Sequence, residues 1–115
     1  MNKITIYHHA RCGKSRQTLA LLRENGIEPE IIEYVKNPPS FDEIVNVLKR
    51  LDIPAEKLVR KNEAIFKENY SGKELSEKQY IQAMVDDPIL IERPIVIKDN
   101  KAVIGRPPEN INLLL

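Results

Sequence analysis

The chain contains one cysteine, Cys12, and the residues around it are polar and cationic rather than apolar. Arg11, Gly13 and Lys14 flank it, and Arg16 follows closely. The thiolate is the nucleophilic form of cysteine, and nearby cations or a helix N-terminus lower the cysteine pKa from about 8.5 to ~3.5–7.5. We therefore interpret Cys12 as a reactive nucleophile rather than as a small residue of the core.

Ser15 occupies the position at which a second cysteine would complete a Cys-x-x-Cys motif. A hydroxyl group cannot form a disulfide bond, so oxidative turnover of Cys12 requires a thiol from another molecule. Ser15 also has a simpler interpretation, because serine in the first turn of a helix satisfies backbone donors. The two interpretations are compatible.

Two adjacent histidines, His8 and His9, precede the cysteine. Neighbouring side chains of a strand point to opposite faces, so only one of them readily faces the thiol. We expect His8 to tune the electrostatics of Cys12 or to hydrogen-bond near it; a solvent-exposed surface histidine is the alternative. A metal site made of His8, His9 and Cys12 is disfavoured, because the chain has no further Cys or His to complete a tetrahedral site. We expect no metal.

Arg60, Arg93 and Arg106 stand out by their context. Arg93 precedes Pro94 at the start of an expected strand, and Arg106 lies in the Gly-Arg-Pro-Pro stretch at 105–108. A guanidinium group stays charged and offers a planar set of donors to a tetrahedral oxyanion. Taken singly, an arginine is most often a solvated surface charge.

The hydrophobic pattern predicts the elements that position these residues. Residues 3–8 alternate like a strand, 13–25 have helical spacing, and 30–35 predict a second strand. Such a β-α-β unit is nearly always right-handed with parallel strands. Capping-box patterns beginning at Ser40 and Ser76, and a further helix from Pro54 through Phe66, predict a helical middle. Residues 94–97 and 102–104 predict a hairpin, followed by a terminal helix from Pro107-Pro108.

This order of elements predicts an α/β protein with a thioredoxin-like fold and a mixed central sheet. We expect a single domain over residues 1–115, with the helical insert at approximately 40–88. In such a fold the X-Pro bond before the third strand, here Arg93–Pro94, is usually cis and lies beside the reactive cysteine.

The composition limits the partners. Lys and Arg number 18 and Asp and Glu number 17 among 115 residues, so no overall basic charge favours nucleic acid or a membrane surface. No apolar run approaches the ~20 residues of a membrane-spanning helix, and the first residues do not resemble a signal peptide. We expect a cytoplasmic monomer with Cys12 as a free thiol.

Three separated motifs resemble the glutaredoxin-linked arsenate reductases, the ArsC-like proteins. They are the first loop with Cys12, the Asp-Asp-Pro and Arg-Pro steps at 86–94, and the Gly-Arg-Pro-Pro-Glu stretch at 105–109. The resemblance implies arsenate, or a similar oxyanion, as substrate, glutathione as co-substrate, glutaredoxin as partner and no bound cofactor. It implies Cys12 as nucleophile and Arg60, Arg93 and Arg106 as oxyanion ligands.

The sequence also departs from the family pattern. His9 and Ala10 stand where the family commonly has Asn-Pro, and the length resembles short housekeeping members. One alternative is therefore a related thiol oxidoreductase with another substrate, or an iron–sulfur carrier like monothiol glutaredoxins. Another is an Spx-like regulator that binds RNA polymerase, although such proteins usually carry the second cysteine that Ser15 replaces.

Overall fold

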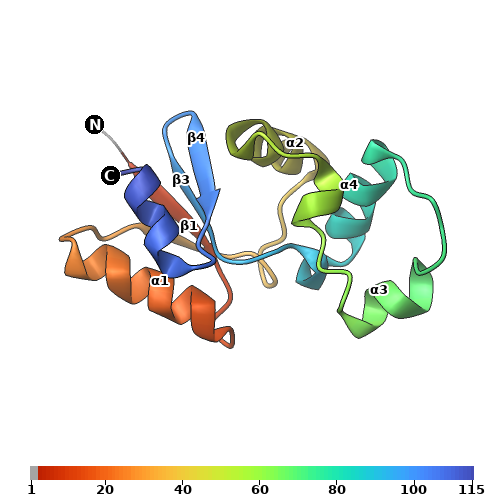
Figure 1. The fold of residues 1–115 in the computed structure, drawn as a ribbon, viewed down its shortest axis with the longest axis horizontal. Helices are drawn as coiled ribbons and strands as arrows, with labels where there is room; N and C mark the ends of the chain where they lie inside the picture. Colours follow the sequence, from red (N-terminus) through yellow and green to blue (C-terminus); the bar gives the residue numbers. More distant parts are fainter. Residues whose placement is uncertain (1–2) are drawn as a thin grey trace. The chain divides into compact units, whose positions relative to one another are not determined.

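Four short strands form a mixed sheet in the order β2-β1-β3-β4 (Figure 1). In the computed structural model, which describes residues 3–115, β1 pairs in parallel with β2, while β3 is antiparallel to both β1 and β4. This mixed sheet and its helices confirm the predicted thioredoxin-like fold class. The strands are β1 (Ile4–His8), β2 (Glu30–Glu33), β3 (Ile95–Lys98) and β4 (Lys101–Ile104).

The chain divides into two compact units, which we describe separately. Residues 3–37 and 93–115 form the unit that contains the sheet, and residues 38–92 form a helical unit. The helical unit extends slightly beyond the insert expected at 40–88. That the whole chain behaves as one domain stays a prediction.

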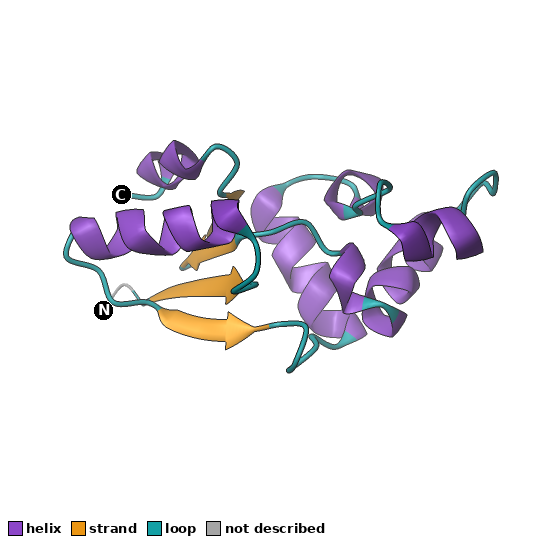
Figure 2. Cartoon of the chain, turned by 90° about the horizontal axis from the view of Figure 1, so that it is seen from below, coloured by secondary structure: helices purple, strands orange, loops and turns teal. Residues whose placement is uncertain are grey.

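Helix α1 (Gly13–Glu24) and the 3-10 helix η3 (Pro108–Leu113) lie on the same side of the sheet (Figure 2). Leu22 of α1 and Ile111 of η3 are fully buried, and they share an apolar core with Ile6 and Val96 of the strands. Because only four residues separate the end of β1 from the start of α1, Cys12 is placed directly at the helix N-terminus.

The helical unit contains α2 (Phe41–Leu51), α3 (Ala64–Asn69) and α4 (Glu77–Asp86), with 3-10 turns η1 (Ala55–Leu58) and η2 (Pro88–Leu90). Both predicted capping boxes are confirmed. The Ser40 hydroxyl accepts from the Glu43 N–H, and the Glu43 carboxylate accepts from the Ser40 N–H; Ser76 and Gln79 repeat this arrangement.

The prediction of one helix from Pro54 through Phe66 is wrong. Helix η1 stops at Leu58, Val59 is extended, and α3 starts only at Ala64. Val59 forms an antiparallel bridge with Ile91, and flanking bonds join Arg60 N–H to the Leu90 carbonyl and Glu92 N–H to the Leu58 carbonyl. The backbone groups of this segment therefore serve a short two-stranded pairing instead of a helix.

Two further boundaries differ from expectation. The second strand ends at Glu33 rather than at Val35, because the Glu33 carbonyl accepts the N–H groups of Lys36 and Asn37 and closes a turn. The terminal helix is a 3-10 helix, and Leu113 at its end is 74% exposed. Within residues 3–115, no helix has both the length and the apolar character needed to cross a membrane.

Candidate active site

Cys12 is the N-cap residue of α1. Its own N–H donates to the His9 carbonyl at 2.9 Å, and its carbonyl accepts the Arg16 N–H at 3.0 Å. The sulfur is partly exposed, and the nearby backbone N–H groups of Ser15 and Lys14 are among the causes that lower its pKa. The thiol therefore lies at the positive end of the helix, where unpaired N–H groups stabilise an anion.

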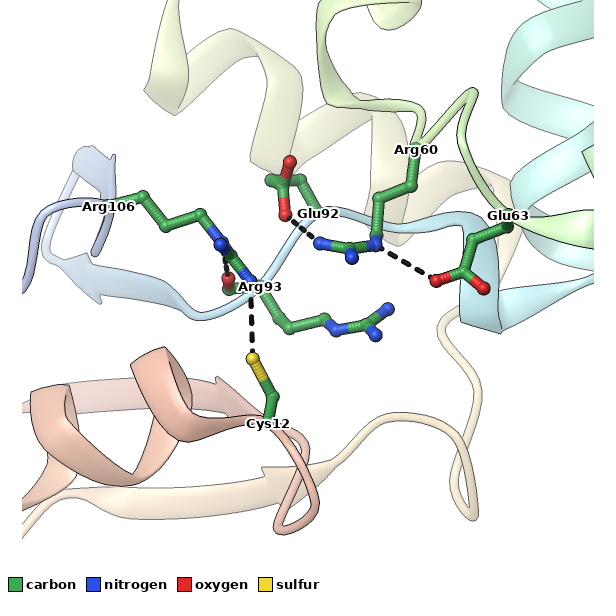
Figure 3. A network of polar contacts seen from close by, with 6 residues as sticks. All are labelled: Cys12, Arg60, Glu63, Glu92, Arg93 and Arg106. Carbon is green, nitrogen blue, oxygen red and sulfur yellow. Dashed lines mark hydrogen bonds and ion pairs between the residues drawn. The ribbon is translucent and has the colours of Figure 1, made fainter.

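A guanidinium group from a distant segment, that of Arg106, contacts the same sulfur (Figure 3). Arg106 Nη2 lies 3.2 Å from Cys12 Sγ, and Arg106 Nε donates to the Arg93 carbonyl at 2.7 Å. The Arg93 side chain is 7% exposed and is among the groups that lower the pKa of Cys12. The Arg93–Pro94 bond is cis, as expected, and so is Arg106–Pro107.

These contacts change the acidity of the thiol. Burial raises the pKa of Cys12, but the Ser15 N–H, the Arg93 side chain, the positive charge of Arg106 and the Lys14 N–H together lower it below its ordinary value. Hydrogen bonds and positive charge favour the thiolate over the thiol. The site therefore holds more of the nucleophilic form at neutral pH than a free cysteine would.

His8 and Ser15 form a buried pair beneath this loop. The Ser15 hydroxyl oxygen lies 2.6 Å from His8 Nδ1 and accepts the His9 N–H at 3.0 Å. The Ser15 hydroxyl therefore joins the His8 ring to the backbone of the loop at His9. Burial also lowers the pKa of His8. A neutral His8 adds no positive charge to Cys12 near pH 7, so hydrogen bonding is the part of its expected role that this geometry supports.

Arg60 belongs to the helical unit. Its Nε donates to Glu63 at 3.2 Å, and its Nη1 donates to Glu92 (Figure 3). Burial lowers the pKa of Arg60, but Glu92 and Glu63 raise it by more, so the pKa lies above its ordinary value. Two of its five N–H groups thus serve carboxylates, and its assignment to an oxyanion stays a prediction.

Thr18 and Gly105 are site residues that the sequence analysis missed. The fully buried Thr18 hydroxyl donates to the Gly105 carbonyl at 3.2 Å. A Cβ atom on Gly105 would lie 2.6 Å from Thr18 Oγ1 and 2.8 Å from Pro94 Cγ, so α1 and the residue before Arg106 pack together more closely than a side chain allows. In the sequence, the glycine directly before Arg106 could have indicated this close packing, because glycine is typical of positions where another part of the backbone approaches closely.

The histidines do not assemble a metal site in the part of the chain that the structure describes. No group of three or more His, Cys, Asp or Glu side chains there could hold a metal ion. The ring of His9 instead lies against Tyr34, with centroids 6.3 Å apart. Arg16 Nη1, one of the cations near Cys12, donates to the Ala10 carbonyl at 2.8 Å and holds the loop.

A thioredoxin-like fold with one activated thiol at the start of its first helix defines a class of thiol-dependent redox proteins. Residues 7–114 match the ArsC family, and the chain belongs to that family. It is 49% identical over 111 residues to the uncharacterized protein YfgD of Escherichia coli (strain K12), covering 95% of this chain and 93% of that protein.

Other relatives are named for an activity. An arsenate reductase of Neisseria meningitidis is 37% identical over 117 residues, and the alignment covers 100% of both chains. The solved structure of an arsenate reductase from Vibrio cholerae superposes with a TM-score of 0.94 at 39% identity, covering 99% of this chain and 98% of that one. These similarities support an oxidoreductase of the arsenate reductase family.

Proposed function

We propose that the protein reduces arsenate to arsenite through the thiolate of Cys12, with glutathione as co-substrate and glutaredoxin as the partner that regenerates it. The observation that carries the proposal is the 3.2 Å contact between Arg106 Nη2 and Cys12 Sγ at the N-terminus of α1. The same groups that stabilise a thiolate are suited to bind an oxyanion beside it. The proposal needs no tightly bound cofactor, because the electrons come from external thiols.

The arginines account for binding of the substrate. Arsenate, like a phosphate group, carries about two negative charges near pH 7. Arg93 and Arg106 would offset this charge and orient the arsenic toward the sulfur. Arg60 is included as a third ligand on the strength of the family resemblance alone, and its variant tests that part separately.

The chemistry proceeds in three balanced steps. The Cys12 thiolate attacks arsenic and displaces hydroxide, which forms a sulfur–arsenic bond. The glutathione thiolate then attacks the Cys12 sulfur; the sulfur–arsenic bond breaks, its electron pair goes to arsenic, and pentavalent arsenic becomes trivalent. A glutaredoxin thiolate removes glutathione from the resulting mixed disulfide and releases the Cys12 thiolate. Because Cys12 is the only cysteine in the chain, the second and third steps require external thiols.

The test is arsenate turnover in an assay that supplies glutathione and glutaredoxin. We expect wild-type turnover to depend on both thiols, to be inhibited by phosphate and to disappear in Cys12→Ser. Lys101→Gln, which changes an exposed cation on β4, is the matched control and should retain wild-type turnover. Full activity of Cys12→Ser would refute the mechanism, and turnover of a simple disulfide without arsenate turnover would favour another thiol oxidoreductase.

The arginine variants test the binding step. A hydrogen bond to a charged group contributes about 1.5–3 kcal/mol, so Arg93→Ala or Arg106→Ala should raise the KM for arsenate roughly 10- to 100-fold. Arg60→Gln should raise KM in the same direction. Unchanged kinetics in any one of the three would remove that arginine from the proposed site.

A further inference from the structure

Asn110 lies in η3, directly after the Gly-Arg-Pro-Pro-Glu stretch, and it holds the backbone of Arg106. Its side-chain Nδ2 donates to the carbonyls of Ile104 and Arg106, both at 3.0 Å. Its backbone N–H donates to the Pro107 carbonyl at 3.0 Å. One amide group therefore ties together the chain on both sides of Gly105 and fixes the peptide from which the Arg106 side chain extends.

The amide is itself held in place by the core. The next residue, Ile111, is fully buried in the cluster that joins α1 to the sheet, and Leu114 is buried at the end of the same segment. Asn110 is thus fixed by its neighbours on the η3 side and bonded to the β4 side of the loop. This arrangement links the packing of the core to the orientation of an arginine at the reactive sulfur.

We propose that Asn110 is a positioning residue that holds Arg106 in its contact with Cys12 and thereby strengthens oxyanion binding. The arginine side chain is long and loses about 2 kcal/mol of rotamer freedom when it is held in one conformation. With its backbone fixed by Asn110 and its Nε fixed by the Arg93 carbonyl, few rotamers remain. Arg106 is then already oriented before substrate arrives, which reduces the entropy lost on binding.

The inference rests on the proposed function for its effect on arsenate, but its effect on the thiol can be measured without turnover. The experiment compares Asn110→Ala with Asn112→Ala, a control on the same short helix at an exposed position. The pKa of Cys12 is followed by the ultraviolet absorbance of the thiolate, and KM and kcat are measured in the coupled arsenate assay. Asn110→Ser retains one donor and tests for partial rescue.

We expect Asn110→Ala to raise the pKa of Cys12 by about half a unit and the KM for arsenate about threefold, with kcat nearly unchanged. Asn110→Ser should lie between Asn110→Ala and wild type, and Asn112→Ala should match wild type. In an Arg106→Gln background, Asn110→Ala should change neither quantity, because the arginine through which Asn110 acts has been removed.

Each other outcome would overturn the proposal. Equal effects of Asn110→Ala in both backgrounds would show that Asn110 does not act through Arg106. An unchanged thiol pKa in folded Asn110→Ala, checked by its thermal unfolding, would show that Asn110 does not position Arg106. If wild type failed to reduce arsenate, the proposed function would fall, while the thiol measurements would still decide the role of Asn110.

Discussion

The hydroxyl of Thr18 donates to the carbonyl of Gly105, 87 positions further along the chain, and both residues are buried. This contact fastens the first helix to the loop that presents Arg106. Cys12 lies at the start of that helix, so the distance between the thiol and the arginine depends on how closely α1 approaches Gly105.

Gly105→Ala should therefore damage both stability and the site. Its Cβ would lie 2.6 Å from Thr18 Oγ1 and 2.8 Å from Pro94 Cγ, and overpacking of this kind typically costs about 1–3 kcal/mol. Urea unfolding measures the loss. Gly13→Ala is the matched control for stability, because the nearest atom to its Cβ, Arg16 Nη2, is 3.8 Å away. Equal stability of Gly105→Ala and wild type would contradict the close packing.

The rate at which an alkylating reagent modifies Cys12 should rise with pH around a midpoint below that of a free thiol. The lowered pKa of Cys12 has its cause in the Ser15 N–H, Arg93 and Arg106, which together outweigh the effect of burial. Arg106→Gln removes one positive charge and should move the midpoint upward. A wild-type midpoint at or above about 8.5 would refute an activated thiol.

The lowered pKa of Cys12 also predicts how the stability of the fold depends on pH. Between the lowered folded-state pKa of Cys12 and its unfolded value near 8.5, the unfolded chain binds more protons. Stability from this group therefore rises with pH across that window and is lost as pH falls through the folded-state pKa. Subtracting the unfolding free energies of Cys12→Ser from those of wild type at each pH should isolate this slope, and a slope of opposite sign would contradict it.

His8 should make the protein sensitive to mild acid. Burial lowers its pKa, so its contribution to stability is complete above the unfolded value of about 6.5 and is lost as pH falls through the folded-state pKa. Urea unfolding from pH 7.5 down to about 5 should show a smaller loss in His8→Gln than in wild type. His9→Gln, at a partly exposed histidine, provides the comparison. If His9→Gln reduced the acid-induced loss of stability more than His8→Gln does, the acid sensitivity would come from His9 and the prediction would be wrong.

The capping box at Ser40 predicts a local cost in the helical unit. Ser40→Ala removes the hydroxyl that accepts the Glu43 N–H, and loss of such a cap costs about 1 kcal/mol. Ser71→Ala makes the same chemical change at an exposed turn and should have little effect. Thermal unfolding of the two variants gives the comparison, and equal losses would show that the cap does not stabilise α2.

Features determined by neighbouring residues were predictable from the sequence. Both capping boxes follow from side chains three positions apart, and Cys12 falls at a helix N-terminus because a strand pattern gives way to a helical one around it. The segment at Val59 was not predictable in this way. Its extended conformation depends on pairing with Ile91, more than thirty positions away, and nothing in its local pattern indicates that partner.

The candidate site shows the same division. Cys12 has polar neighbours that indicate reactivity, and Arg93 and Arg106 precede prolines at expected strand boundaries. Thr18 has no distinctive neighbours, because it acquires its role only from the Gly105 carbonyl, which folding brings near from 87 positions away. The neutral state of His8 likewise depends on burial beside Ser15, which a sequence pattern does not reveal.

The sheet brings β1 next to β3, although the whole helical segment separates them in the sequence. During synthesis, a nascent chain that has left the ribosome only as far as residue 92 contains Cys12 but neither Arg93 nor Arg106. Its sulfur then lacks the contributions of Arg93 and Arg106 that lower the thiol pKa in the complete fold. The full lowering of the Cys12 pKa therefore depends on the segment that follows residue 92, which supplies both Arg93 and Arg106.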